Sequence, residues 1–277
     1  MLARITGAAM RGILVAFLIA MPSLLLPNFA TDSAEIVALV ALLGGILTFA
    51  EYYSNFPSFI EFREAPPLNR MRFISLLVTI GVLSLMARHP FEPTGLTTLI
   101  HGMGSKLGNA LDFSYSPVHL VTLVMPPHAS AETVSMVRAA ASLAYVIGLI
   151  SVAVFFFTIH IRNWPVANGA FNVWVNLPLF DPTTGGDVVH RLQRDGRINL
   201  IFGVLLPFAI PAAVSALSAV FDPAVLSHPQ TLVWMIGAWG FLPTSLLMRG
   251  MAMLRVAELI EQKRRRAYAN AEAIQTA

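Results

Sequence analysis

Six long apolar runs constrain what this chain can fold into more than any other feature. Each run has 15 to 23 residues and contains no Asp, Glu, Lys, Arg or His. A helix needs about 20 apolar residues to cross a hydrocarbon core about 30 Å thick, and it satisfies its own backbone hydrogen bonds there. We therefore predict an all-α, polytopic integral membrane helix bundle with interfacial amphipathic segments. The expected spans are 12–30, 36–50, 73–87, 139–159, 198–220 and 231–248.

The composition agrees with a membrane location and excludes several kinds of chemistry. Charged residues make up 12% of the chain, about half of the ~25% typical of a soluble domain. The chain has no cysteine, so disulfides, thiolate metal sites and cysteine nucleophiles are excluded. Arg4 and Arg11 precede the first run as in a signal peptide, but the segment LPNFATDSA offers no convincing small-x-small cleavage site. We expect this first segment to be retained as an anchor.

The positive charges predict how the bundle is oriented. If the N-terminus is cytoplasmic and all six runs cross, fifteen Lys and Arg residues fall on the cytoplasmic side and only Arg88, Lys106 and Arg138 fall outside. Cytoplasmic loops carry an excess of Lys and Arg. We therefore predict a multi-pass protein of the inner (plasma) membrane of a bacterium with both termini cytoplasmic. Its six-helix transmembrane domain covers 1–255 and a basic cytoplasmic helical tail covers 256–277.

The connection 88–138 is expected to lie outside the membrane. Its apolar residues recur at helical spacing from Leu96 to Leu111, which predicts an amphipathic helix on the outer leaflet or against the bundle. The stretch VHLVTLVM is too short to cross, and we expect it to be a buried extended or re-entrant piece. The sixth run has no stop signal, so its helix is expected to continue to about residue 269.

Two connections on the cytoplasmic side share an order of residues. An Asn-aromatic-Pro triplet follows the second run and another follows the fourth, and each connection closes with two arginines. The residues concerned are Asn55, Pro57, Arg70 and Arg72 in the first, and Asn163, Pro165, Arg194 and Arg197 in the second. One interpretation is a duplicated unit of parallel orientation. The other is convergence, because Asn and Pro end helices and Arg collects inside.

In either case both connections are expected to lie along the inner membrane surface. The aromatic side chains that we expect to face lipid are Phe56, Phe59, Phe62, Phe171, Trp174 and Phe180. The charged side chains that we expect to face water are Glu61, Arg63, Glu64 and Arg70. The paired arginines are candidates for contact with lipid headgroups.

Two features inside the runs bear on helix packing. Pro207 and Pro211 predict a kink in the fifth run. The kink is either a bend accommodated by neighbouring helices or part of a substrate path that exposes free carbonyls. Ala140, Ala144 and Gly148 form a stripe of small residues on the fourth run, suited to close contact within the bundle or with a partner.

The runs offer little for chemistry. Ion-coupled carriers and proton pumps usually need ionisable groups inside the bilayer, as does intramembrane acid–base catalysis, and the runs contain none. Five of the seven histidines map to the outer side, but their spacings match no zinc pattern. The stretch DPTTGGD lacks the lysine of a phosphate-binding loop, and Asp187 is expected to cap a short helix instead. We expect no metal, no cofactor and no nucleic-acid partner.

These observations favour a non-catalytic function. We expect an accessory, assembly or scaffold subunit of a membrane protein complex, whose partners are the lipid bilayer and other membrane subunits. In such a bundle the interior needs only to be packed. We expect Leu206, Phe208 and Ile210 to fill it.

Two alternatives remain open. A channel or uniporter for a small neutral solute would have Pro207 and Pro211 at its centre, where their freed carbonyls would line the path. A membrane enzyme acting on lipid would use Arg70, Arg194 and Arg197 to hold phosphate.

The charge bias generates the first testable prediction. A reporter fused after Ala277 should report a cytoplasmic location, and one inserted near Asn109 should report the outside, because fifteen of eighteen basic residues then lie inside. Reporter activity in intact cells measures both. An external C-terminus would contradict the six-span topology.

Overall fold

The chain folds as a bundle of long helices. The computed structural model describes residues 2–27, 31–161, 164–165, 176–178, 180, 186–217 and 223–275. These residues form eight α-helices and one 3₁₀ helix, Pro223–Ser227. Six α-helices are long and apolar enough to cross a membrane: α1 (Leu2–Leu25), α2 (Thr31–Tyr53), α3 (Leu68–Arg88), α6 (Ala131–Ile161), α8 (Val188–Ala216) and α9 (Pro229–Gln275). The prediction of an all-α bundle with six apolar spans is confirmed.

Several spans begin or end at a different residue from the apolar run that predicted them. α6 begins at Ala131 rather than near residue 139, because polar residues before the run continue the helix. Asp187 caps α8 by accepting a hydrogen bond from the Val189 amide at 3.1 Å. We expected Asp187 to cap a separate short helix, but the helix that begins there is the fifth span itself. α1 ends at Leu25, short of the expected residue 30.

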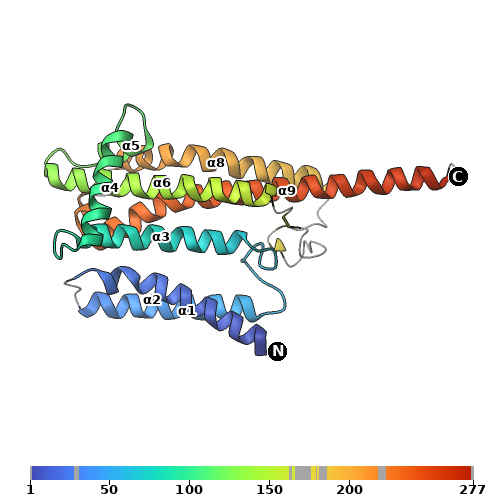
Figure 1. Ribbon diagram of the computed structural model, residues 1–277, viewed down its shortest axis with the longest axis horizontal. Coiled ribbons are helices and arrows are strands. Elements are labelled where there is room, and N and C mark those ends of the chain that lie inside the picture. Colours follow the sequence, from blue (N-terminus) through green and yellow to red (C-terminus); the bar gives the residue numbers. More distant parts are fainter. Residues whose placement is uncertain are drawn as a thin grey trace.

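The six spans run along the long axis of the molecule, and both termini lie at the same end, which we call the terminal end (Figure 1). α9 continues past the other helices there and reaches Gln275, beyond the expected residue 269. In this extension Arg264 donates a hydrogen bond to Asp187 at 2.7 Å. That bond and the Val189 amide hold the pKa of Asp187 below its ordinary value.

Two shorter helices, α4 (Gly95–Leu111) and α5 (Pro117–Leu123), occupy the opposite, far end (Figure 1). α4 is the amphipathic helix predicted from the sequence, and it lies across the ends of the spans and packs on α3 and α6. The stretch VHLVTLVM was expected to be extended or re-entrant, and the extended form is wrong, because most of the stretch forms α5. Ser116 caps α5 by accepting the His119 amide at 2.9 Å, and Val118 and Val121 are buried.

A charged group fastens the connection between α4 and α5 to α6. Asp112 lies 2.6 Å from Nδ1 of His119 and accepts a hydrogen bond from Arg138 at 2.9 Å. Burial raises the pKa of Asp112, but these two partners outweigh burial, and the pKa lies below its ordinary value. The carboxylate therefore stays charged and holds the far end together at neutral pH.

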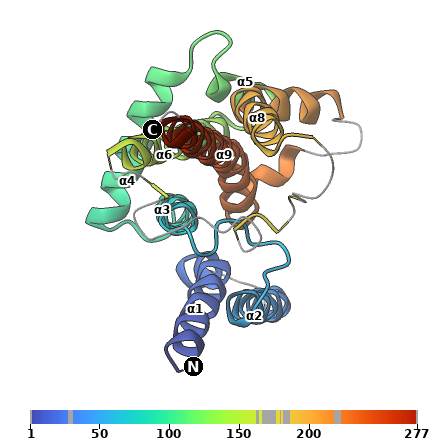
Figure 2. The same ribbon diagram turned by 90° about the vertical axis from the view of Figure 1, so that its right-hand side faces the viewer.

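α9 is the centre of the bundle. α3, α6 and α8 all pack on it, and Figure 2 shows them around it when the molecule is viewed from the terminal end. Of the six spans α9 is the most buried and α2 the least. α2 packs on α1 and makes almost no contact with the other helices, while α1 also packs on α3.

The hairpin of α1 and α2 depends on a close approach of two backbones. A methyl group placed on Gly12 would lie 2.6 Å from the carbonyl oxygen of Gly45, and one on Gly45 would lie 3.0 Å from the carbonyl oxygen of Gly12. No rotation of a side chain relieves a contact with a backbone atom. Small residues that let backbones approach are the usual means of joining helices in lipid, where apolar surface alone gives no driving force.

This contact generates a prediction about stability. Gly12→Ala should lower the free energy of unfolding by about 1–3 kcal/mol, the usual cost of overpacking, because α1 and α2 must separate to admit the methyl group. Gly102→Ala in α4 is the matched control, since nothing lies within 4 Å of the added methyl group. It should be neutral or stabilise by about 0.5–1 kcal/mol, because alanine favours a helix over glycine. Thermal unfolding in detergent measures both, and equal effects would contradict the packing.

Candidate functional site

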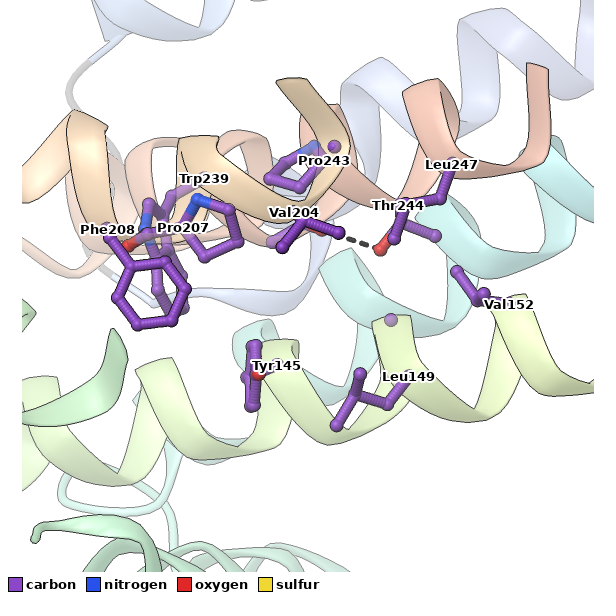
Figure 3. Close-up of a pocket in the computed structure, with 13 residues that line it drawn as sticks. Tyr145, Leu149, Val152, Val204, Pro207, Phe208, Trp239, Pro243, Thr244 and Leu247 are labelled. Atoms are coloured by element: carbon purple, nitrogen blue, oxygen red, sulfur yellow. Dashed lines mark hydrogen bonds between the residues drawn. The ribbon is translucent and has the colours of Figure 1, made fainter. Parts of the chain in front are cut away.

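A cavity of about 220 Å³ lies between α6, α8 and α9, near the middle of α6 and α8 and in the first half of α9 (Figure 3). α6 and α8 each pack along α9 but make almost no contact with each other, and α5 packs on both at the far end. The cavity is therefore a gap between two helices that share a neighbour. Its lining consists of Tyr145, Gly148, Leu149, Val152, Gly203, Val204, Pro207, Phe208, Trp239, Gly240, Pro243, Thr244 and Leu247.

Pro207 and Pro211 both lie on the buried face of α8, and the helix continues through them to Ala216. Pro211 has no N–H, so the carbonyl of Pro207 loses the donor that a helix normally supplies. The indole N–H of Trp239 on α9 donates to this carbonyl at 3.2 Å. The Pro207 carbonyl was expected to be free, but it holds α8 to α9. The indole thereby satisfies a polar group that would otherwise be unpaired in the bilayer.

The stripe on α6 also faces α9. A methyl group on Gly148 would lie 2.4 Å from Oγ1 of Thr244, and one on Gly240 would lie 3.0 Å from Cβ of Ala144. Ala140 is fully buried one turn further toward the far end. The stripe thus lies inside the bundle, and it allows α6 and α9 to touch beside the cavity.

The side chains expected to fill the interior do not fill it. Phe208 is 39% exposed, and Leu206 and Ile210 are only partly buried. The buried face of α8 consists instead of smaller residues, including Gly196 and Gly203, because α9 approaches so closely: a methyl group on Gly203 would lie 2.6 Å from Cγ of Leu247. Large side chains on α8 therefore turn outward.

The cavity has an apolar lining with two hydroxyl groups. Thr244 donates to the carbonyl of Gly240 at 2.8 Å, so its hydroxyl is hydrogen-bonded within α9. Tyr145 lies beside Trp239, with ring centroids 6.2 Å apart. The lining contains no acid, base or metal ligand. Chemically the cavity can hold an apolar molecule, and its lining contains no carboxylate and no histidine.

A second, polar feature lies at the terminal end. Glu61, in the connection between α2 and α3, accepts two hydrogen bonds from Arg249 of α9, at 2.5 Å from Nε and 2.7 Å from Nη2. Arg249 also donates from Nη1 to Asn199 of α8 at 2.9 Å. Arg72 of α3 donates to the hydroxyl of Ser245 from Nε at 2.7 Å. One ionic network thus joins a connection to three spans.

Glu61, Arg63 and Phe62 were expected at the surface, and this expectation was wrong. The side chains of Glu61 and Arg63 are each only 6% exposed, and Phe62 is 1% exposed. Arg63 donates to the carbonyls of Glu51 at 2.8 Å and Ser54 at 2.9 Å. One signal was available: Arg249 follows directly on an apolar run, and a charge in that place needs a partner.

The other expectations for the two connections gave mixed results. Phe56 and Phe59 are exposed as expected, at 77% and 53%. Phe180 is buried, contrary to expectation, with Arg191 above its ring at 4.5 Å. Phe171 and Trp174 lie outside the described residues.

The two connections are hydrogen-bonded to each other. The side chain of Asn176 accepts from the Glu64 amide at 2.9 Å, and its carbonyl accepts from the Phe62 amide at 2.5 Å. Trp164 donates from its indole to the carbonyl of Ala65 at 3.2 Å. Both connections therefore lie together at the terminal end, which either interpretation of their shared order allows.

The residues of that shared order take different places. Pro57 and Pro165 are both buried, whereas Asn55 is exposed and its carbonyl accepts a hydrogen bond from Arg63 at 3.2 Å. Asn163 lies outside the described residues. The four arginines also differ. Arg70 is exposed, Arg72 bonds Ser245, Arg194 pairs with Asp195 at 3.2 Å, and Arg197 is exposed. The duplication stays a hypothesis.

Histidines at the far end form pairs with other side chains rather than a metal site among the described residues. His89 and His101 stack with ring centroids 4.7 Å apart, and His119 pairs with Asp112. Among the residues described, no three His, Asp or Glu side chains come together as ligands.

Comparison of the chain with protein families, with curated proteins and with solved structures found no match.

The ion pair at the terminal end generates a prediction. Glu61→Gln should lower the free energy of unfolding by about 3 kcal/mol, the lower end of the range for a broken buried pair, because 26% of the Arg249 side chain is exposed. Combining it with Arg249→Met should cost less than the sum of the two single changes, since neither charge is then left unpaired. Unfolding in detergent measures this cycle.

Arg265→Gln is the control, because Arg265 pairs with Glu261 on the exposed part of α9. Its effect should stay within about 0.5 kcal/mol. Strict additivity of the Glu61 and Arg249 changes would show that the pair does not hold the terminal end together.

Proposed function

We propose that the protein is a non-catalytic accessory, assembly or scaffold subunit of a membrane protein complex in the inner membrane of a bacterium. The observation that carries this proposal is that the buried carboxylates of the described residues are both fully used within the chain. These carboxylates are Glu51 and Glu61. Glu61 is held by Arg249.

Glu51 is occupied by backbone groups. Its carboxylate accepts from the amides of Ser58 at 3.0 Å, Phe59 at 3.3 Å and Ile60 at 3.3 Å. A general base must reach a substrate proton, and a coupled carrier must release and rebind its ion. Carboxylates held by several donors serve instead to fix the connection after α2, which supports a structural role for the terminal end.

The exposed surface of α2 supports a role as a subunit that binds other membrane proteins. It packs on α1 almost alone, and the large apolar side chains of one helical face are exposed, including Ile36, Leu39, Leu43 and Leu47. A peripheral helix joined to the bundle through one neighbour leaves most of its surface for contacts in the bilayer. We propose that this surface meets partner subunits.

The orientation in the proposal rests on charge. Six spans return the chain to the side on which it began, and the positive residues gather on the side of both termini. The positive-inside rule then favours a cytoplasmic location for the terminal end.

The cavity favours a second candidate, a channel or uniporter for a small neutral solute. It lies near mid-membrane, as a substrate site should. Its lining is apolar, however, and the Pro207 carbonyl is already bonded to Trp239. A lipid-acting enzyme is less favoured, because no contact among the described residues brings Arg70, Arg194 and Arg197 to one site.

The proposal predicts the effect of crowding α2. Leu43→Trp should reduce the amount of co-purifying membrane subunit about tenfold, because overpacking an interface costs about 1–3 kcal/mol. Leu205→Trp on α8 is the matched control, since Leu43 and Leu205 are 51% and 53% exposed. The measurement is the stoichiometry of complexes purified in mild detergent.

A clean monomer or homo-oligomer from the unmodified chain would contradict the proposal. Solute flux in liposomes that disappears when Pro207 and Pro211 are both changed to Ala, without loss of folding, would support the channel instead.

A further inference from the structure

The cavity between α6 and α8 opens sideways, toward the bilayer. Leu149 of α6 and Val204 and Phe208 of α8 all line it and are 50%, 58% and 39% exposed. Figure 3 shows the α6 side chains across from those of α8, with α9 also contributing. At mid-membrane the surrounding medium is hydrocarbon. An apolar molecule can therefore enter from the side, without crossing a headgroup region.

A stripe on α8 connects this opening to the terminal end. Arg197, Ile201, Val204 and Phe208 follow the spacing of one helical face, and all four are exposed. With a rise of 1.5 Å per residue, Arg197 lies about 10 Å from Val204 and about 16 Å from Phe208 along the helix. Half of a hydrocarbon core is about 15 Å. A charge at Arg197 is thus one acyl-chain length from the cavity.

α6 presents a matching stripe on the other side of the gap. Leu149, Val152, Phe156 and His160 follow one helical face toward the same end. α6 runs toward the terminal end and α8 runs away from it, so both stripes lead from the cavity toward the terminal end (Figure 1). α6 and α8 barely touch, and we call the strip of surface between these two stripes, from Arg197 and His160 to the cavity, the groove.

Arg197 is free to bind an anion. Within the part of the chain that the structure describes, it has no ion pair and no hydrogen bond, whereas its neighbour Arg194 pairs with Asp195 at 3.2 Å. The guanidinium group matches phosphate well, since it donates several hydrogen bonds in one plane. A positive charge at the edge and an apolar groove below it are complementary to an anionic phospholipid.

We propose that this groove is a binding site for one anionic phospholipid, whose phosphate lies at Arg197 and whose acyl chain fills the cavity between Val204, Leu149 and Trp239. The chain would fill the space where α6 and α8 diverge. This site does not depend on the proposed role as a scaffold. It requires only that the terminal end lies at a membrane surface.

Trp239 makes the proposal measurable. It lines the cavity but is only 5% exposed, so bulk lipid does not reach its indole. Phosphatidylglycerol with a dibrominated acyl chain quenches tryptophan on contact. In vesicles that mix it with unlabelled phosphatidylcholine, a chain whose only tryptophan is Trp239 should be strongly quenched. Dibrominated phosphatidylcholine at the same mole fraction should quench about fivefold less effectively, the discrimination expected from one basic residue at a membrane surface.

Two pairs of matched variants separate the headgroup from the chain. Arg197→Gln should abolish the preference for phosphatidylglycerol, while Arg194→Gln should keep it. Val204→Phe should fill the cavity and remove the quenching, while Leu205→Phe, which places the same ring on the adjacent lipid-facing position, should leave it unchanged. Quenching is also compared between Val204→Phe and Leu205→Phe in the chain that keeps all its tryptophans. The result then does not depend on whether the single-tryptophan chain folds.

Native mass spectrometry of the unmodified chain gives an independent reading. One phosphatidylglycerol should stay bound to the protein, and it should be lost from Arg197→Gln and retained by Arg194→Gln. Absence of Trp239 quenching by either brominated lipid would overturn the site. Equal quenching in the Val204 and Leu205 variants would overturn the placement of the chain, and quenching without a lipid preference would overturn the role of Arg197.

Discussion

The close approach of α9 to its neighbours is the interaction on which the rest of the structure depends. Helices in a bilayer gain no hydrophobic free energy by moving apolar side chains from lipid into a contact with another helix. They associate instead through dense packing of small residues. α9 achieves this with α6 at Gly240 and Ala144, and with α8 at Gly250, where a methyl group would lie 2.7 Å from the carbonyl oxygen of Gly196. α6 and α8 are thereby each fixed to α9 and not to each other. The gap between them follows from that geometry.

The terminal end is held by a different kind of force. Here connections return to the bundle, and Glu61 meets an arginine 188 residues later in the chain. Taking both charges partly out of water is costly, and their attraction offsets that cost only when the geometry is good and further hydrogen bonds are made. Arg249 meets these conditions, since it binds both carboxylate oxygens and Asn199. In such a network the loss of one partner is costly, because the other charge is left buried and unpaired.

The sequence predicted what depends on local physics and missed what depends on distant partners. Six spans could be recognised because a run of apolar residues in lipid has to form a helix, and the cap at Asp187 and the helix of α4 follow from neighbouring residues. The burial of Glu61 and Phe62 could not be recognised, because it depends on residues of α8 and α9 far along the chain. The proline positions were visible, but the donor for the carbonyl of Pro207 was not, since Trp239 lies 32 residues away.

The close contacts that α6 and α8 each make with α9 leave a cavity where α6 and α8 diverge. Gly148, Gly203 and Gly240 line this cavity, and a methyl group on any of them would press on a neighbouring helix. An apolar cavity of about 150 Å³ can stay dry and accept a small apolar molecule, and this one is larger at about 220 Å³. The Pro207 carbonyl and the Thr244 hydroxyl already have partners within the protein. Since the opening faces hydrocarbon, a lipid chain is the nearest material that can restore the lost contacts. The same residues that join the helices therefore select what occupies the gap between them.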